Sequence, residues 1–133
     1  MRHRKLKGRL GRTTGPRDAL LSALVCSLIR ERRLKTTISK ARAARVLAER
    51  MVTLGKKATV AARRQAFAVL HHREPVIALF DEIAPMCAKR AGGYTRIIKL
   101  GRRSSDSSEM ALLEWVDVPV PQPATAPEAA PKT

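Results

Sequence analysis

Apolar residues recur at helical spacing through most of the chain and then give way to strand-forming residues. The first helix is predicted over residues 16–32, where six apolar positions form one broad face. These positions are Leu20, Leu21, Leu24, Val25, Leu28 and Ile29. Pro16 and Asp18 suit a first helical turn, because proline needs no N–H there and an acid complements the helix dipole.

A short strand and a second helix are predicted next. Residues 34–38 favour a strand, because three of them in succession are β-branched. Ser39 is suited to cap the helix that follows, and Gly55 is suited to supply a left-handed residue at its end. The apolar stripe of this helix is Ala44, Leu47, Met51 and Leu54. Its cations lie mostly off that stripe, so they either meet phosphates or form an ordinary solvated face. They are Lys40, Arg42, Arg45 and Arg50.

Two further helices are predicted before residue 92. In the helix over residues 59–71, Val60, Phe67 and Leu70 mark the buried side, and Arg63 and Arg64 project elsewhere. Pro75 opens the next helix, Pro85 interrupts it, and Gly92 with Gly93 ends the helical region. The apolar face of this last helix is Val76, Leu79, Phe80 and Ile83.

The rest of the chain changes to strand character and then to proline. Residues 94–100 and 110–118 predict the two strands of a hairpin, with a polar tip at 101–108 that begins with Arg102 and Arg103. A lone hairpin is marginally stable in water, so it needs the 34–38 strand or a helix beneath it. The Pro- and Ala-rich residues 119–133 are predicted to be a disordered tail.

The net charge of the chain predicts a polyanionic partner. The 133 residues include 27 Lys and Arg against 11 Asp and Glu, a formal net charge of +16. A polyanion offsets such self-repulsion, so nucleic-acid binding is predicted. Only 3% of the residues are aromatic, which favours contacts to phosphates and RNA shape over base stacking. Residues 1–17 carry cations and no acid, so they form a flexible basic arm ahead of the folded domain at 18–118.

The pattern contains no recognisable catalytic or metal motif. Cys26 and Cys87 belong to no CxxC pair, so buried reduced thiols in a cytoplasmic protein are expected. The three histidines form no HExxH motif, and no GxSxG or P-loop sequence occurs. Four acids lie among cations, where ion pairing or solvation explains them better than acid–base catalysis; they are Glu31, Glu49, Glu74 and Glu109. We expect no enzymatic activity, metal, cofactor or small-molecule substrate.

Several segments occur together in an order that resembles one family. They are MRHRK at the start, LGR at 10–12, KTT at 35–37, TLGK at 53–56, RRQAF at 63–67, AGGYTRI at 91–97, MA at 110–111 and EWV at 114–116. The series is similar to the bacterial family of large-subunit ribosomal protein seventeen, from residue 1 to about residue 118. Gly11 and the TTGP sequence at 13–16 depart from the Asn and the polar Asn-Ser-Ser stretch common there, which leaves individual contacts of the arm open.

The resemblance implies an α+β fold, with about four helices on a small sheet, a C-terminal β-hairpin and a flexible basic N-terminal arm. It also implies a structural role on large-subunit ribosomal RNA, on the solvent side near the nascent-chain exit and beside neighbouring large-subunit proteins. Charge and the matched motifs together give the candidate RNA-binding residues, among which Tyr94 has a hairpin-core position as an equal alternative. They are Arg2, His3, Arg4, Lys5, Lys7, Arg9, Arg12, Arg17, Lys35, Lys40, Arg42, Arg45, Lys56, Arg63, Arg64, Arg90, Tyr94, Thr95, Arg96 and Arg102.

Two rival functions use the same composition. A nucleoid or histone-like DNA-binding protein has the same charge, and only the motif series favours the ribosome over it. A cationic lipoprotein or membrane-surface protein is the other rival, because an apolar run at 20–29 follows a basic stretch and contains Cys26. That run is too short to span a bilayer, and a buried helix face with no membrane contact is the preferred interpretation.

Overall fold

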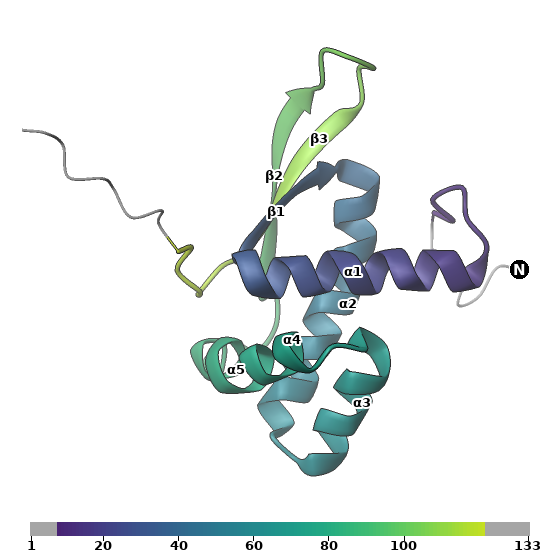
Figure 1. The fold of residues 1–133 in the computed structure, drawn as a ribbon. Helices are drawn as coiled ribbons and strands as arrows, with labels where there is room; N and C mark the ends of the chain where they lie inside the picture. Colours follow the sequence, from purple (N-terminus) through teal and green to yellow (C-terminus); the bar gives the residue numbers. More distant parts are fainter. Residues whose placement is uncertain (1–7, 122–133) are drawn as a thin grey trace, which may run out of the picture.

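The structure, a computed structural model, describes residues 8–121 (Figure 1). Its elements in chain order are α1 (Thr14–Glu31), β1 (Arg33–Thr37), α2 (Ile38–Lys57), α3 (Val60–Leu70), α4 (Arg73–Ala78), the π-helix η1 (Leu79–Ile83), α5 (Ala84–Met86), β2 (Thr95–Arg102) and β3 (Glu109–Trp115). The predicted α+β class, with helices against a small sheet and a C-terminal hairpin, is confirmed. The predicted arm up to residue 7 and the predicted tail from residue 122 lie outside the described residues.

The long helix α2 connects the two halves of the fold. It contacts all three strands at its N-terminal part and α3, η1 and α5 at its C-terminal part, while α1 lies across it (Figure 1). Small side chains make this close packing possible, because Ala41, Ala44 and Ala48 of α2 are fully buried. Met51 and Val52 continue the same buried stripe, so the helix is enclosed by the core along most of its length.

The three strands form an antiparallel sheet in the order β1-β3-β2. The strand predicted at 34–38 therefore supports the hairpin, as its register Leu34 to Leu113 shows. The last strand in the sequence is the central one, and Trp115 at its end is 2% exposed. Its indole Nε1 donates to the carbonyl of Leu28 in α1 at 3.1 Å, which joins the first helix to the last strand.

The end of the second helix differs from what its glycine predicts. Gly55 was predicted to end the second helix in the left-handed region, but α2 continues through it to Lys57, and Ala58 has φ +52. Arg32 and His71 end α1 and α3 in the same left-handed way. Gly55 serves packing instead, because a Cβ placed on it would lie 2.8 Å from the Cβ of Ala84. The glycine is required by close approach and not by its φ.

The helix starts also shift slightly. Helix α1 begins at Thr14, so the last four residues of the predicted arm belong to it. Helix α2 begins at Ile38 with Thr37 at its N-cap, so the predicted cap Ser39 lies inside the helix. In both cases the helix begins one or two residues before the position expected from side-chain type, because tertiary packing also decides where a helix begins.

The buried side predicted for the third helix is largely wrong. Val60 is 66% exposed and Phe67 48% exposed, whereas Ala62, Ala66 and Leu70 face the core. The small alanines allow α3 to pack closely, so the larger apolar side chains are left outside. By contrast, the apolar face predicted for the fourth helix is buried throughout.

Pro85 distorts the last helical segment without interrupting it. Helix α4, η1 and α5 follow one another without a break from Arg73 to Met86, and Pro85 lies in the first turn of α5. Proline lacks the N–H that an α-helix would bond to the carbonyl four residues earlier, and its ring clashes with that carbonyl. The π-helical turn just before it widens the backbone at this point.

Both cysteines are buried free thiols, as predicted. Desolvation by the surrounding core raises the pKa of each thiol above its usual value. Cys26 lies on the buried face of α1, where its Sγ donates to the carbonyl of Leu70 at 3.6 Å. Within residues 8–121, every helix is too short or too polar to cross a bilayer.

Candidate nucleic-acid interface

A groove between α2 and β2 brings together two of the predicted cations. Its helical wall is built from residues spaced three, four or seven apart, which places them on one face of α2. The lining residues are Ile38, Arg42, Arg45, Val46 and Glu49 of α2 with Ile97 and Lys99 of β2. Lys99 joins the predicted cations Arg42 and Arg45, although it is far from them in sequence.

Glu49 lies at one end of this groove and makes two hydrogen bonds. Its Oε1 accepts from Nε of Arg45 at 3.2 Å and from Oγ1 of Thr95 at 3.0 Å. Thr95 is buried, with 3% exposure, so its hydroxyl gives Glu49 a rigid partner on the neighbouring strand. The candidate Thr95 is therefore an internal hydrogen-bond donor.

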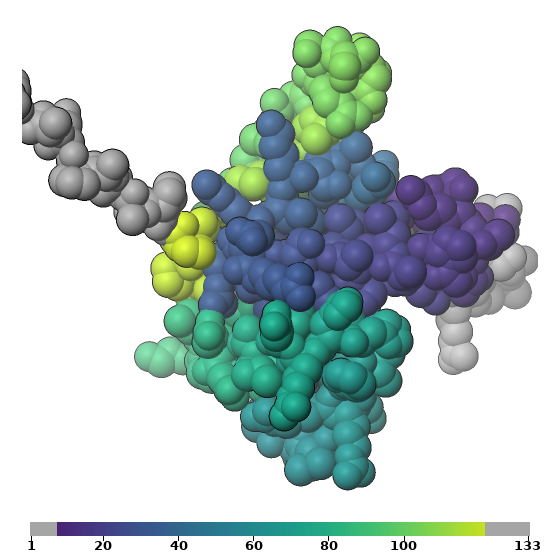
Figure 2. Space-filling view, viewed as in Figure 1, coloured from purple at the N-terminus to yellow at the C-terminus, as the bar shows by residue number. Residues whose placement is uncertain are grey.

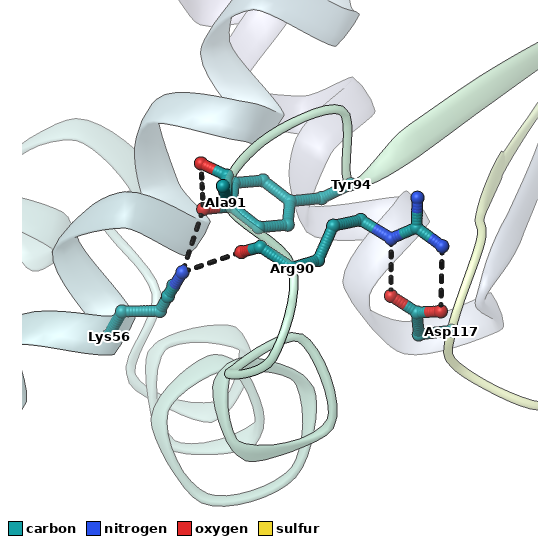
Figure 3. Close-up of polar contacts among 5 residues, drawn as sticks. All are labelled: Lys56, Arg90, Ala91, Tyr94 and Asp117. Atoms are coloured by element: carbon teal, nitrogen blue, oxygen red, sulfur yellow. Dashed lines mark hydrogen bonds and ion pairs between the residues drawn. The ribbon is translucent and has the colours of Figure 1, made fainter.

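Hydrogen bonds join a second group of candidates, Lys56, Arg90 and Tyr94, into one network (Figure 3). Lys56 donates from Nζ to the carbonyl of Arg90 at 2.7 Å and to the hydroxyl of Tyr94 at 3.1 Å. The Tyr94 hydroxyl donates in turn to the carbonyl of Ala91 at 3.4 Å. Tyr94 is only 4% exposed, so the hairpin-core position left open for it is the one it occupies.

Arg90 closes this network through a two-point ion pair. Its Nε and Nη2 donate to the two carboxylate oxygens of Asp117 at 2.8 and 3.2 Å. The Arg90 guanidinium holds the pKa of Asp117 below its usual range, because it hydrogen-bonds the charged carboxylate. The network fixes the loop between α5 and β2 against α2 and the end of β3.

Ion pairing separates the remaining candidates into two groups. Arg63 pairs with Asp81 at 3.4 Å, and Arg96 pairs with the buried Glu114. Of the acids expected to be paired or solvated, Glu49 pairs with Arg45 and Glu74 pairs with the distant Arg30. Within residues 8–121, the other cationic candidates have no ion pair with an acid. They are Arg9, Arg12, Arg17, Lys35, Lys40, Arg42, Lys56, Arg64 and Arg102.

The hairpin tip stands away from the body of the molecule (Figure 2). Arg103 and Asp106 hold it together through hydrogen bonds of 2.9 and 2.6 Å, so the side chain of Arg103 is used internally. Arg102, beside it, is exposed. Of the two arginines predicted at the tip, Arg102 is the one that remains available to a ligand.

The candidates at the N-terminus are only partly described. Arg2, His3, Arg4, Lys5 and Lys7 lie outside the described residues. Arg9 and Arg12 precede α1 and are exposed, and Arg12 donates to the carbonyl of Leu10 at 2.7 Å. Arg17 lies half-buried on α1. In residues 8–121 there is no group of three His, Cys, Asp or Glu side chains that could hold a metal ion.

A comparison with known protein families shows to which of them the chain is related. The model of the family described as ribosomal protein L17 matches residues 20–116. The chain belongs to this family. The prediction made from the motif series is therefore confirmed.

Curated relatives extend the match beyond residues 20–116. The large ribosomal subunit protein bL17 of Akkermansia muciniphila is 47% identical over 133 residues, which cover 100% of this chain and 96% of the relative. That of Fusobacterium nucleatum is 50% identical over 116 residues, 87% of this chain and 100% of the relative. That of Acidobacterium capsulatum is 50% identical over 114 residues, 86% of this chain and 71% of the relative.

The L17 match contains the whole α2–β2 groove and nearly all of the Lys56 network. Charge counting alone found Arg42 and Arg45 but not Lys99 or the role of Glu49. The signal for Glu49 was present, because it lies four residues after Arg45 and seven after Arg42 on a helix. No local signal in the sequence places Lys99 beside them, since that contact depends on the sheet.

Proposed function

We propose that this chain is a structural constituent of the large ribosomal subunit and binds large-subunit ribosomal RNA during translation. The observation that carries this is the L17 family match over residues 20–116, together with relatives named as large-subunit proteins. The proposed role is structural and not enzymatic, with no cofactor and no small-molecule substrate.

The distribution of charge supports binding by more than one part of the chain. Seven arginines pair with acids in the described residues, while exposed cations without such partners remain on β1, α2, α3 and the hairpin tip. These include Lys35, Arg42, Arg64 and Arg102. Unpaired cations spread over several elements favour contacts to a folded polyanion, with the basic arm at 1–17 adding its own charge.

The position of the chain within the large subunit is also part of the proposal. We place the chain on the solvent side near the nascent-chain exit, beside neighbouring large-subunit proteins, because of the family resemblance. In this arrangement residues 1–17 act as an RNA-binding arm, 18–118 as the ribosomal domain and 119–133 as a separate tail. Crosslinking the assembled particle and mapping the joined nucleotides and peptides tests this placement.

Sucrose-gradient fractionation tests the function itself. The native protein should sediment with large ribosomal subunits and remain with them after DNase treatment. Absence from the subunits together with association with nucleoid DNA would select the DNA-binding rival. Partitioning into detergent with a lipid on Cys26 would select the membrane rival, which the burial of that thiol at 4% exposure argues against.

A further inference from the structure

We propose that the α2–β2 groove holds a segment of the RNA backbone, and that Glu49 positions Arg45 so that it can donate to a phosphate there. This assignment rests on the proposed function and deepens it. It predicts that one particular acid strengthens binding to a polyanion, which net charge alone would not predict.

Three cations of the groove come from two elements that run in opposite directions (Figure 1). Glu49 and Thr95 are hydrogen-bonded at one end. Four residues along β2, from Thr95 to Lys99, cover about 13 Å, which equals about nine residues of helix. Counting back that far from Glu49 reaches the first turn of α2, which agrees with Ile38 and Arg42 lining the groove together with Lys99. The cations therefore form a row along the groove and not one point charge.

The hydrogen bonding of Arg45 leaves most of its donors available. Only its Nε is used, by Glu49, and the side chain is 45% exposed. A guanidinium has five N–H donors, so four remain on its two outer nitrogens, which is the fork that suits a phosphate. Arg90 and Arg103 differ, since each gives both Nε and Nη2 to one carboxylate.

The composition of the groove favours RNA backbone over a protein segment. The acid that lines it is already bonded to Arg45, so the charge facing a ligand comes from Arg42, Lys99 and the outer nitrogens of Arg45. Its apolar residues are aliphatic, and its lining includes no aromatic ring on which a base could stack. A charged chain that presents phosphates without needing base stacking fits this lining best.

Filter binding to a transcript of large-subunit ribosomal RNA, repeated over a series of KCl concentrations, tests the groove. Arg42→Ala and Arg45→Ala should each weaken binding by about tenfold at low salt. Each should also flatten the slope of log affinity against log salt by roughly 0.7 to 0.9, the value for one lost phosphate contact. Arg73→Ala removes an exposed cation from α4 as a matched control and should have a smaller effect on both quantities.

Variants of Glu49 distinguish its role in positioning Arg45 from its effect on the net charge. Glu49→Ala raises the net charge by one yet frees Arg45, so we expect severalfold weaker binding and a flatter salt slope. Glu49→Gln keeps an oxygen that accepts from Arg45 and Thr95, so binding should remain close to wild type or be tighter. Melting curves from Trp115 fluorescence establish that both variants are folded, and Thr95→Val, which removes the second anchor of Glu49, should fall between them.

The outcomes distinguish this inference from the proposed function. If Glu49→Ala binds more tightly with a steeper slope, Glu49 acts only as a repelling charge and the positioning role is overturned. If groove variants lose no more than Arg73→Ala, the groove is not the site although RNA binding stands. A photocrosslinker at Val46→Cys that joins only a neighbouring protein in assembled subunits would also overturn it. Failure of the wild type to bind the transcript would instead count against the proposed function.

Discussion

Gly55→Ala tests the close contact between α2 and α5. The new Cβ would lie 2.8 Å from the Cβ of Ala84, whereas ordinary contacts begin near 3.4 Å, so the two elements must separate by about 0.6 Å. Neither methyl group can rotate away, because a Cβ position is set by the backbone. Such overpacking costs about 1–3 kcal/mol, and the higher helix propensity of alanine returns about 1 kcal/mol. We expect a net loss of about 1 kcal/mol, the middle of the range of about 0–2 kcal/mol that these two effects leave.

Urea unfolding followed by fluorescence measures this loss, because the chain has one tryptophan and Trp115 is buried. Gly15→Ala is the matched control, since Gly15 is also in a helix and has nothing within 4 Å of an added Cβ. It should be neutral or stabilising. Combining Gly55→Ala with Ala84→Gly should recover part of the loss, giving a coupling of about 1 kcal/mol. A Gly55→Ala protein as stable as wild type, or strictly additive effects in this cycle, would refute the reasoning.

Three further predictions concern the arm, a helix end and an ion pair. Deleting residues 1–12 should weaken RNA binding and flatten its salt dependence while the melting temperature is retained; an unchanged salt slope would exclude the arm as an RNA ligand. Ala58→Gly should stabilise the fold by about 0.5–1 kcal/mol in urea unfolding, because φ +52 strains alanine but not glycine, and an equal or lower stability would contradict this. Asp117→Asn should lower the melting temperature at neutral pH. Arg90 lowers the pKa of Asp117 in the folded state from 3.8, so the ion pair stabilises the fold above about pH 4 and this stabilisation is lost as the pH falls further. The melting temperatures of wild type and variant should therefore converge in acid. A difference in melting temperature that stays constant with pH would contradict this.

The sequence predicts the helices and strands well, but not where each helix ends or which side of it faces the core. Periodicity located the helices and the hairpin to within a few residues, because one apolar stripe or two strand-forming runs specify them. Gly55 and Ala58 show the limit: glycine marks a left-handed residue only when no neighbouring element comes close, and tertiary packing placed the turn three residues later. Phe67 shows the same for burial, because two alanines fill the interface and exclude the larger ring.

The candidate site was predictable in charge and less so in geometry. The sequence identifies a surplus of cations, but it does not say which arginines are already bonded to acids in the folded chain. Arg90 and Arg96 meet their acids 27 and 18 residues away, so those pairs exist only after the sheet has formed. The groove has the same origin, since Lys99 reaches Arg42 only through the position of β2 against α2.

The central position of β3 has a consequence for synthesis. Strands β1 and β2 both pair with β3 and not with each other, so β1 has no sheet partner until residues 109–115 have been translated. At typical translation rates, the 78 residues between Thr37 and Trp115 take roughly 4 to 16 s. During that interval the helices can associate, but the strand edges stay open and the indole that bridges α1 and β3 is missing. The nascent chain therefore completes its sheet only after Trp115 has been made.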